Sequence, residues 1–465
     1  MMWRLALACA LCILAAPLRA ETIPGGHYGE VRVSDPRGQL RGFVVLFSEL
    51  SGWSASDNQA ADLLAQHGML VVGVDTPRYA AVLADMAGAC QHLDGDVEAV
   101  SHQLQRERGS HTYFTPILVG TGTGGILAER VLASAPSNTI AGAVSIDPAA
   151  KLDPRFRVCP PDPTVLHDPG LPGFWSIGLT EDVPATISDL ISRLQTVGAK
   201  VDVTRFPPST GRDTMVLALV QPHLEAQAPD EEDVSDLPLV ELRAKTASNM
   251  LAIVLSGDGG WRDLDQTIGH DLQGWGVSVV GFDSLRYFWS RKTPDQTAHD
   301  LARVILTYTK RWNAHSVALI GYSFGADVLP FAYNRLPPKA RAKVRIISLL
   351  GFASSADFEI RVLGWLGLPP SSQALPERPE VAKIPANLVQ CFYGEDETDT
   401  LCPELAKTGV TVIRTSGGHH FGGDYARLSH AILSDWRRRM MKDYAIADYR
   451  NSQVADHTAA MREGP

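Results

Sequence analysis

The chain has 465 residues, of which 45% are hydrophobic and 20% charged, and its formal net charge is −10. This length allows two or three domains, and the composition is that of a globular protein. The excess of acidic residues argues against nucleic-acid binding and is compatible with a cationic ligand.

The N-terminus has the pattern of a secretory signal. Arg4 precedes an apolar run from Leu5 to Ala16, and Ala20 follows a short stretch that suits cleavage. We predict that residues 1–20 are removed after Ala20 and that the protein is exported to the periplasm. The apolar run is too short to span a membrane, and no later stretch is long enough to do so.

The cysteines beyond this segment predict disulfide bonds. They are Cys90, Cys159, Cys391 and Cys402, and an even number in an exported chain favours pairing. Four cysteines allow three connectivities. We predict Cys90–Cys159 and Cys391–Cys402, because each pair then stays within one half of the chain; reduced structural cysteines are the alternative.

The two halves of the chain repeat each other. Residues 43–53 align without a gap on 251–261, and residues 116–124 match 317–325. The period of the repeat is far too long for a solenoid. We therefore predict two domains of one fold.

Each half alternates short apolar runs with helical patterns, which is typical of βαβ crossovers. We predict an α/β fold with a mostly parallel, doubly wound sheet in each domain. The first domain is placed at 21–228 and the second at 239–465, with an acidic linker at 229–238. In the second half we predict strands at 251–256, 277–282, 316–320, 344–350, 387–393 and 409–414, and helices at 263–274, 294–312, 325–336 and 425–440.

A candidate nucleophile lies in the second half. Residues 321–325 read Gly-Tyr-Ser-Phe-Gly, follow an apolar run and precede a helical stretch, which is the context of a nucleophile turn. The two glycines allow strand and helix to pack closely around Ser323. The backbone N–H of Phe324 then lies near a helix N-terminus, where an oxyanion is stabilised. A glycine-rich turn with an incidental serine is the alternative.

A serine nucleophile requires a base and an acid that holds the base, and in this type of fold both follow the serine. The loop Gly-Gly-His-His-Phe follows the last predicted strand, and we predict His419 as the base with His420 as the alternative. For the acid we predict Asp399, with Asp396 second. The disulfide Cys391–Cys402 would link the ends of the loop that carries these carboxylates and hold the acid still.

Further site residues are predicted around the glycine-rich turn at 256–261. A backbone N–H of Gly257 or Asp258 is the predicted second oxyanion donor. As substrate-binding residues we predict Asp258, Asp327 and Trp261. We predict no metal site and no cofactor, since two adjacent histidines do not have the spacing of helical metal ligands.

The first half lacks this set of residues. Gly122 occupies the position of Ser323, and Thr210 and Gly211 stand opposite His419 and His420. The counterpart of the glycine-rich turn also has fewer glycines. We predict that the first domain is a non-catalytic copy.

Taken together, these motifs resemble the bacterial virulence protein family of VirJ and AcvB, within the α/β-hydrolases. The longer AcvB form resembles the chain over its whole length, with a signal peptide, a degenerate first domain and a VirJ-like second domain. The likeness is carried by residues 257–261, 321–327, 393–395, 402–403 and 417–421.

The resemblance implies two tandem α/β-hydrolase-like domains and a periplasmic serine hydrolase that releases lysine from lysyl-phosphatidylglycerol at the membrane surface. It also implies association with type IV secretion components or exported virulence proteins. The alternatives are a non-enzymatic periplasmic adaptor for type IV secretion, and a generic esterase or thioesterase. The apolar residues 362–368 are interpreted as a lipid-contacting lid or a buried core helix.

Overall fold

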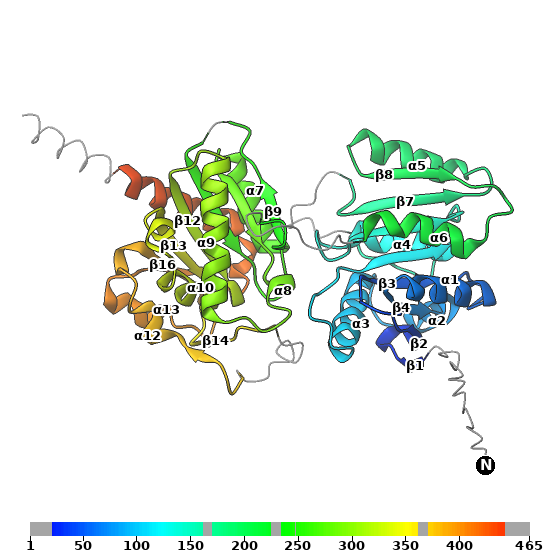
Figure 1. Ribbon diagram of the computed structural model, residues 1–465, viewed down its shortest axis with the longest axis horizontal. Helices are drawn as coiled ribbons and strands as arrows, with labels where there is room; N and C mark the ends of the chain where they lie inside the picture. The colour runs from blue at the N-terminus through cyan, green and yellow to red at the C-terminus, as the bar shows by residue number, and fades with distance from the viewer. Residues whose placement is uncertain (1–20, 161–169, 225–233, 247, 361–370, 442–465) are drawn as a thin grey trace, which may run out of the picture.

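Two α/β domains lie side by side in a computed structural model of the chain (Figure 1). The residues that this structure describes are 21–160, 170–224, 234–246, 248–360 and 371–441. The predicted signal peptide, residues 229–233 of the predicted linker and the apolar segment 362–368 lie outside the described residues.

The first domain is built on an eight-stranded sheet with the order β1-β2-β4-β3-β5-β6-β7-β8. The sheet is parallel from β4 to β8, and β1 and β2 add an antiparallel edge. Its strands are β1 (Glu21–Pro24), β2 (Glu30–Ser34), β3 (Gly42–Phe47), β4 (Met69–Val74), β5 (Ile117–Thr121), β6 (Gly142–Ile146), β7 (Phe174–Leu179) and β8 (Val201–Arg205). Its helices are α1 (Ala55–Gln66), α2 (Thr76–Ala84), α3 (Leu93–Glu107), α4 (Thr123–Ser134), α5 (Ala185–Thr196) and α6 (Arg212–Val220).

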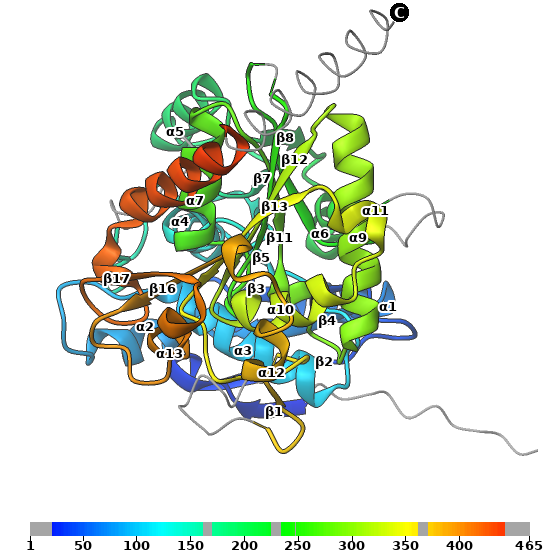
Figure 2. The same ribbon diagram turned by 90° about the vertical axis from the view of Figure 1, so that its left-hand side faces the viewer.

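The second domain has a seven-stranded sheet with the order β17-β16-β13-β12-β10-β11-β9. Its strands are β9 (Leu239–Leu242), β10 (Met250–Leu255), β11 (Ser278–Phe282), β12 (Ser316–Tyr322), β13 (Val344–Leu350), β16 (Val389–Gly394) and β17 (Thr411–Thr415), and β14 (Ser355–Ala356) and β15 (Leu375–Pro376) form a separate pair. Its helices are α7 (Asp263–Gly274), α8 (Ser284–Tyr287), α9 (Pro294–Arg311), α10 (Phe324–Asn334), α11 (Pro338–Arg341), α12 (Glu377–Val381) and α13 (Cys402–Leu405), and residues 425–441 are also helical. Helices α9 and α10 cover one face of the sheet, while α7 and the helix at 425–441 cover the other (Figure 2).

The two sheets share one topology. The order β2-β4-β3-β5-β6-β7-β8 of the first domain corresponds to β9-β11-β10-β12-β13-β16-β17 of the second. The predicted fold class, two tandem, mostly parallel α/β domains, is therefore confirmed. In the second half, the antiparallel edge strand β9 was missed, because it is short and Glu241 interrupts its apolar pattern.

A tryptophan packed on a glycine recurs in both domains. A Cβ added at Gly281 would lie 2.5 Å from the ring of Trp261, and a Cβ at Gly73 would overlap the ring of Trp53. In each case the glycine lies in the second strand of the repeat and the tryptophan follows the first strand. The absence of a side chain at this strand position is therefore a packing requirement.

Helix α3 of the first domain lies against the second domain (Figure 1). Arg106, near its end, donates to the carbonyl oxygens of Trp289 at 2.7 Å and Ile360 at 2.6 Å. The indole N–H of Trp289 donates back to the carbonyl oxygen of Ser110 at 3.0 Å. Tyr113 packs 4.7 Å from the Trp289 ring and belongs to the hydrophobic core of the second domain. These buried contacts fix α3 relative to the second sheet.

Both predicted disulfides are confirmed. The Cα atoms of Cys90 and Cys159 are 4.8 Å apart, and those of Cys391 and Cys402 are 5.5 Å apart. Disulfides of this kind are usual in exported proteins. Within the parts of the chain that the structure describes, no helix combines the length and apolar composition that crossing a bilayer requires.

Replacing Gly281 with alanine should lower the free energy of unfolding by about 1–3 kcal/mol, because the new Cβ would overlap the Trp261 ring. Gly274→Ala at the end of α7 is the matched control. A Cβ there meets nothing within 4 Å, so this change should be neutral or stabilise by about 0.5–1 kcal/mol. Urea denaturation followed by tryptophan fluorescence measures both, and equal midpoints for the two variants would contradict the packing requirement.

Candidate active site

Ser323 lies on a strained turn between β12 and α10. Its backbone has φ 50° and ψ −121°, a conformation that non-glycine residues rarely adopt. A Cβ at Gly321 would lie 2.5 Å from the carbonyl oxygen of Gly325, and a Cβ at Gly325 would overlap the backbone of Leu255 in β10. Strand and helix therefore touch through bare backbone, which is why both positions around the serine require glycine. The N–H of Ser323 donates to the carbonyl oxygen of Leu350 at 2.8 Å and fixes the turn at the end of the sheet.

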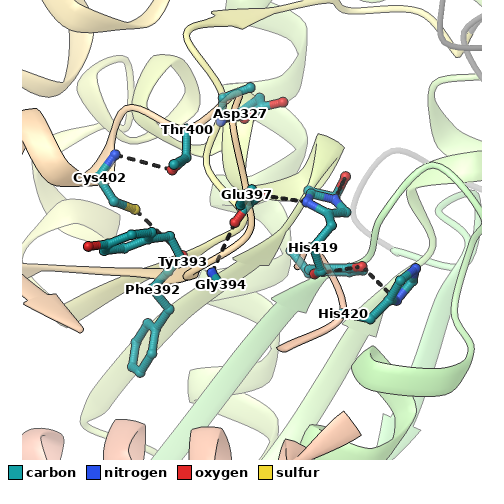
Figure 3. Close-up of polar contacts among 12 residues, drawn as sticks. Asp327, Phe392, Tyr393, Gly394, Glu397, Thr400, Cys402, His419 and His420 are labelled. Atoms are coloured by element: carbon teal, nitrogen blue, oxygen red, sulfur yellow. Dashed lines mark hydrogen bonds and ion pairs between the residues drawn. The ribbon is translucent and has the colours of Figure 1, made fainter. Parts of the chain in front are cut away.

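Ser323 and His419 are brought together as predicted. The hydroxyl Oγ of Ser323 is 2.8 Å from Nε2 of His419, and Nδ1 of His419 is 2.6 Å from Oε1 of Glu397. Figure 3 shows the Glu397 carboxylate directed at the His419 ring. A carboxylate at Nδ1 favours the tautomer with its proton on that nitrogen, which leaves Nε2 to accept the serine proton.

The predicted acid is wrong, because the carboxylate at His419 belongs to Glu397 and not to Asp399 or Asp396. The Glu397 side chain is only 7% exposed, and its second oxygen accepts the N–H of Gly394 at 3.2 Å. Asp396 and Asp399 are exposed, and Asp399 Oδ1 lies 3.4 Å from the Ser354 hydroxyl instead. The turn after β16 directs Glu397 inward, and the longer glutamate side chain reaches the histidine.

His420, the alternative base, does not contact Ser323. It is exposed, and its Nδ1 lies 3.2 Å from the hydroxyl of Tyr322. Burial raises the pKa of Tyr322, so this hydroxyl stays protonated. His420 therefore borders the site, and His419 alone of the pair is positioned as a base.

The N-terminus of α10 places the N–H of Phe324, the predicted oxyanion donor, directly after Ser323. Helix α10 begins at Phe324, directly after Ser323, and the first N–H groups of a helix have no acceptor within the helix. For the second oxyanion donor, the two predicted candidates, Gly257 and Asp258, have different outcomes. The N–H of Gly257 donates to the buried carboxyl of Asp265 at 3.4 Å, so Gly257 is not available for this role as it stands. The N–H of Asp258 stays a prediction.

The degenerate first domain shows what such a turn binds when its serine is missing. Gly122 has φ 53°, close to the φ of Ser323, and directly precedes α4 as Ser323 precedes α10. The carboxylate of Glu49 fills the space where a side chain at Gly122 would lie. Its Oε2 accepts the N–H of Thr123, the counterpart of Phe324, at 3.4 Å. A side-chain oxygen of Glu49 therefore occupies the first domain's equivalent of the oxyanion site.

A cavity of about 390 Å³ opens over Ser323 and His419. Among the described residues that line it, four are acidic and one is basic. The acidic residues are Glu98, Asp258, Asp263 and Asp265, and the basic residue is Arg262. Burial raises the pKa of Asp265 well above its usual range, which favours its neutral form. The cavity is suited to a ligand that carries positive charge.

Two predicted substrate-binding residues lie elsewhere. The side chain of Trp261 is 2% exposed and packs within its own domain against Gly281. Asp327 is not among the described residues that line the cavity, and its Oδ1 accepts the N–H of Ala353 at 2.9 Å. Burial raises the pKa of Asp327 well above its usual range, so it is not suited to bind an ammonium group. Of the predicted set, Asp258 lines the cavity.

Residues 249–440 match the family described as bacterial virulence protein (VirJ). The match spans most of the second domain and the whole of the Ser323–His419–Glu397 arrangement. No curated protein matches the chain.

Solved structures of α/β serine hydrolases match a little under half of the chain. XC6422 from Xanthomonas campestris, described as a serine hydrolase without lid, is 17% identical over 46% of this chain and 99% of its own, with a TM-score of 0.30. Esterase 2 of Thermogutta terrifontis, phosphonylated by sarin, is 16% identical over 45% and 97%, with a TM-score of 0.33. Est1E from Butyrivibrio proteoclasticus is 12% identical over 44% and 93%, with a TM-score of 0.32.

Glu397→Gln should slow the acylation of Ser323 by a p-nitrophenyl ester by about 100- to 10,000-fold, because glutamine no longer stabilises the imidazolium of His419. Asp396→Asn and Asp399→Asn remove the same charge from the same loop and should change the rate by about twofold or less. Release of p-nitrophenol in a stopped-flow experiment measures all three. A larger loss in Asp399→Asn than in Glu397→Gln would return the acid role to Asp399.

Proposed function

We propose that the protein is a periplasmic serine esterase that cleaves the aminoacyl ester of lysyl-phosphatidylglycerol and releases lysine and phosphatidylglycerol. The observation that carries the proposal is the contact of Ser323 with His419 at 2.8 Å, with Glu397 behind the histidine, at the base of an acidic cavity. The VirJ match of the second domain and the resemblance of the whole chain to the AcvB form favour this substrate.

The reaction follows from the positions of these groups. Oγ of Ser323 attacks the aminoacyl carbonyl carbon while Nε2 of His419 accepts its proton, and Glu397 stabilises the imidazolium. The carbonyl oxygen becomes an oxyanion that the N–H of Phe324 stabilises; one such donor accounts for about 100- to 1,000-fold in rate. The bond to the glycerol oxygen then breaks, and His419 gives its proton to that oxygen.

Water completes the cycle. His419 accepts a proton from a water molecule as the water attacks the lysyl-Ser323 ester. The second tetrahedral intermediate then collapses to free lysine, and His419 returns the proton to Oγ of Ser323. Lysine carries two ammonium groups in the substrate, and the acidic lining of the cavity attracts them. Phosphatidylglycerol stays in the membrane, which loses cationic lipid as a result.

Ser323→Ala should reduce lysine release from vesicles that contain lysyl-phosphatidylglycerol by at least about 1,000-fold, since no nucleophile remains. Ser354→Ala is the matched control, because Ser354 lies in the same domain and outside the described lining of the cavity. Released lysine is quantified against an enzyme-free blank that corrects for spontaneous hydrolysis of the ester.

The same assay separates the alternatives. An adaptor for type IV secretion requires no nucleophile, so release of lysine by Ser323→Ala at the wild-type rate, or no release by the wild-type protein, would contradict the proposed esterase. A generic esterase would hydrolyse short acyl esters at least as fast as lysyl-phosphatidylglycerol in the same vesicles. That outcome would keep the reaction and discard the substrate.

The proposed location is tested by the state of the cysteines. The structure pairs Cys90 with Cys159 and Cys391 with Cys402, and such bonds form in an oxidising compartment. Cells quenched in acid and treated with a maleimide reagent in denaturant should therefore show none of these four thiols labelled. Labelling of all four without prior reduction would place the protein in a reducing compartment.

A further inference from the structure

The cavity over Ser323 has a wall that comes from the degenerate first domain. Gly95, Glu98 and Ala99 of α3 line it together with the turn at 257–260 and the two histidines of the second domain. Glu98 and Ala99 follow Gly95 by three and four residues, so all three lie on the same side of the helix. Two of them have little or no side chain, and a Cβ added at Gly95 would meet nothing within 4 Å. The helix therefore leaves open space above the nucleophile.

Glu98 is the charged residue on this face, and it contacts the second domain directly. Nη1 of Arg262 donates to both of its carboxylate oxygens, at 2.7 and 2.9 Å. Neither side chain is more than 28% exposed, so the pair is largely shielded from water. The Arg262 guanidinium also lies on the active-site turn, because a Cβ at Gly259 would approach its Nε and one Nη at 2.8 Å.

The ion pair between Glu98 and Arg262 lowers the positive charge that Arg262 presents to a ligand in the cavity. Burial lowers the pKa of Arg262, but Glu98 and Asp263 outweigh this and raise it overall, so the guanidinium is charged. Without Glu98, this positive charge would face the cavity with Asp263, at 3.7 Å, and Asp258 as the acidic groups that still act on it. Burial raises the pKa of Glu98, while Arg262 lowers it and favours the charged form. Burial is the larger effect on Glu98, so its pKa is raised overall, and Arg262 opposes that rise.

We infer that the first domain sets the specificity of the second, because Glu98 of α3 neutralises Arg262 and thereby keeps the catalytic cavity attractive to a cationic aminoacyl group. Glu98 is in this view a specificity-determining residue, contributed by a domain that has no nucleophile of its own. The inference rests on the proposed function for the identity of the ligand, the lysyl group. In this proposal the second domain provides the catalytic groups, and the first domain sets the preference for a positively charged substrate.

The test measures binding, so that it does not depend on turnover. In the full chain carrying Ser323→Ala, calorimetry gives the affinities of lysinamide and of norleucinamide, which has the same chain length without the terminal amine. We expect lysinamide to bind more tightly, and Glu98→Gln to reduce this preference by about tenfold, the size expected when one nearby charge is lost in a partly buried site. Glu98→Gln combined with Arg262→Gln should restore most of the preference, since the opposing charge is removed as well.

Glu107→Gln is the matched control, because it removes one carboxylate from the exposed end of the same helix, outside the described lining of the cavity. It should leave the preference for lysinamide unchanged. An unchanged preference in Glu98→Gln, or the absence of any preference in the Ser323→Ala protein, would overturn the inference. If Glu98→Gln alters the preference while the wild-type protein releases no lysine from the lipid, the proposed reaction fails and the inference stands.

A steric variant tests the wall itself. Gly95→Leu places a side chain in open space on the face of α3 that lines the cavity, and it also removes a helix glycine. We expect this variant to fold with at least wild-type stability and to bind both amides about tenfold more weakly. Unchanged binding of both amides would show that α3 does not bound the ligand site.

Discussion

The catalytic geometry depends on backbone-to-backbone contact at the turn that carries Ser323. Helix α10 can approach β10 and β12 this closely only because Gly321 and Gly325 lack side chains. That approach forces the residue between them to a positive φ and places it at the carboxyl end of the sheet. The strain is held by the hydrogen bond from Ser323 to Leu350 and by the packed sheet beneath it. Glu397 follows β16 and His419 follows β17, and these loops bring His419 to the Ser323 hydroxyl and Glu397 to His419.

The first domain shows that this turn is a property of the fold and not of the chemistry. Gly122 keeps the same strained conformation without a serine, and its N–H bonds to the strand β6 as that of Ser323 bonds to β13. The vacated space is filled by Glu49, a residue that stands where the second domain has a glycine. Restoring a serine alone at Gly122 would therefore create a clash and no active site. The nucleophile, the base and the open oxyanion turn are lost together.

Much of the site was predictable because its signals are local. Apolar runs located the central strands, the spacing of glycines located Ser323, and the loop after the last strand located His419. Glu397 was missed because the choice among neighbouring carboxylates depends on the direction of one turn. The N–H of Asp396 bonds to Gly417 and that of Glu397 to Gly394, which sends the Glu397 side chain inward. The repeat did indicate a structural role for Trp261. The first domain lacks the catalytic residues, yet it has the same tryptophan–glycine pair, Trp53 and Gly73.

The wall contributed by α3 was not predictable from sequence, because it depends on how two domains pack. Glu98 and Arg262 are far apart in the chain, and neither stands in a recognisable motif. A buried ion pair contributes little net stability, yet removing one partner leaves a buried charge uncompensated, at a cost of about 3–5 kcal/mol. Such a pair constrains the relative position of the domains more than it stabilises them. The first domain lacks a nucleophile, but the ion pair holds it in the position that places α3 over Ser323 of the second domain.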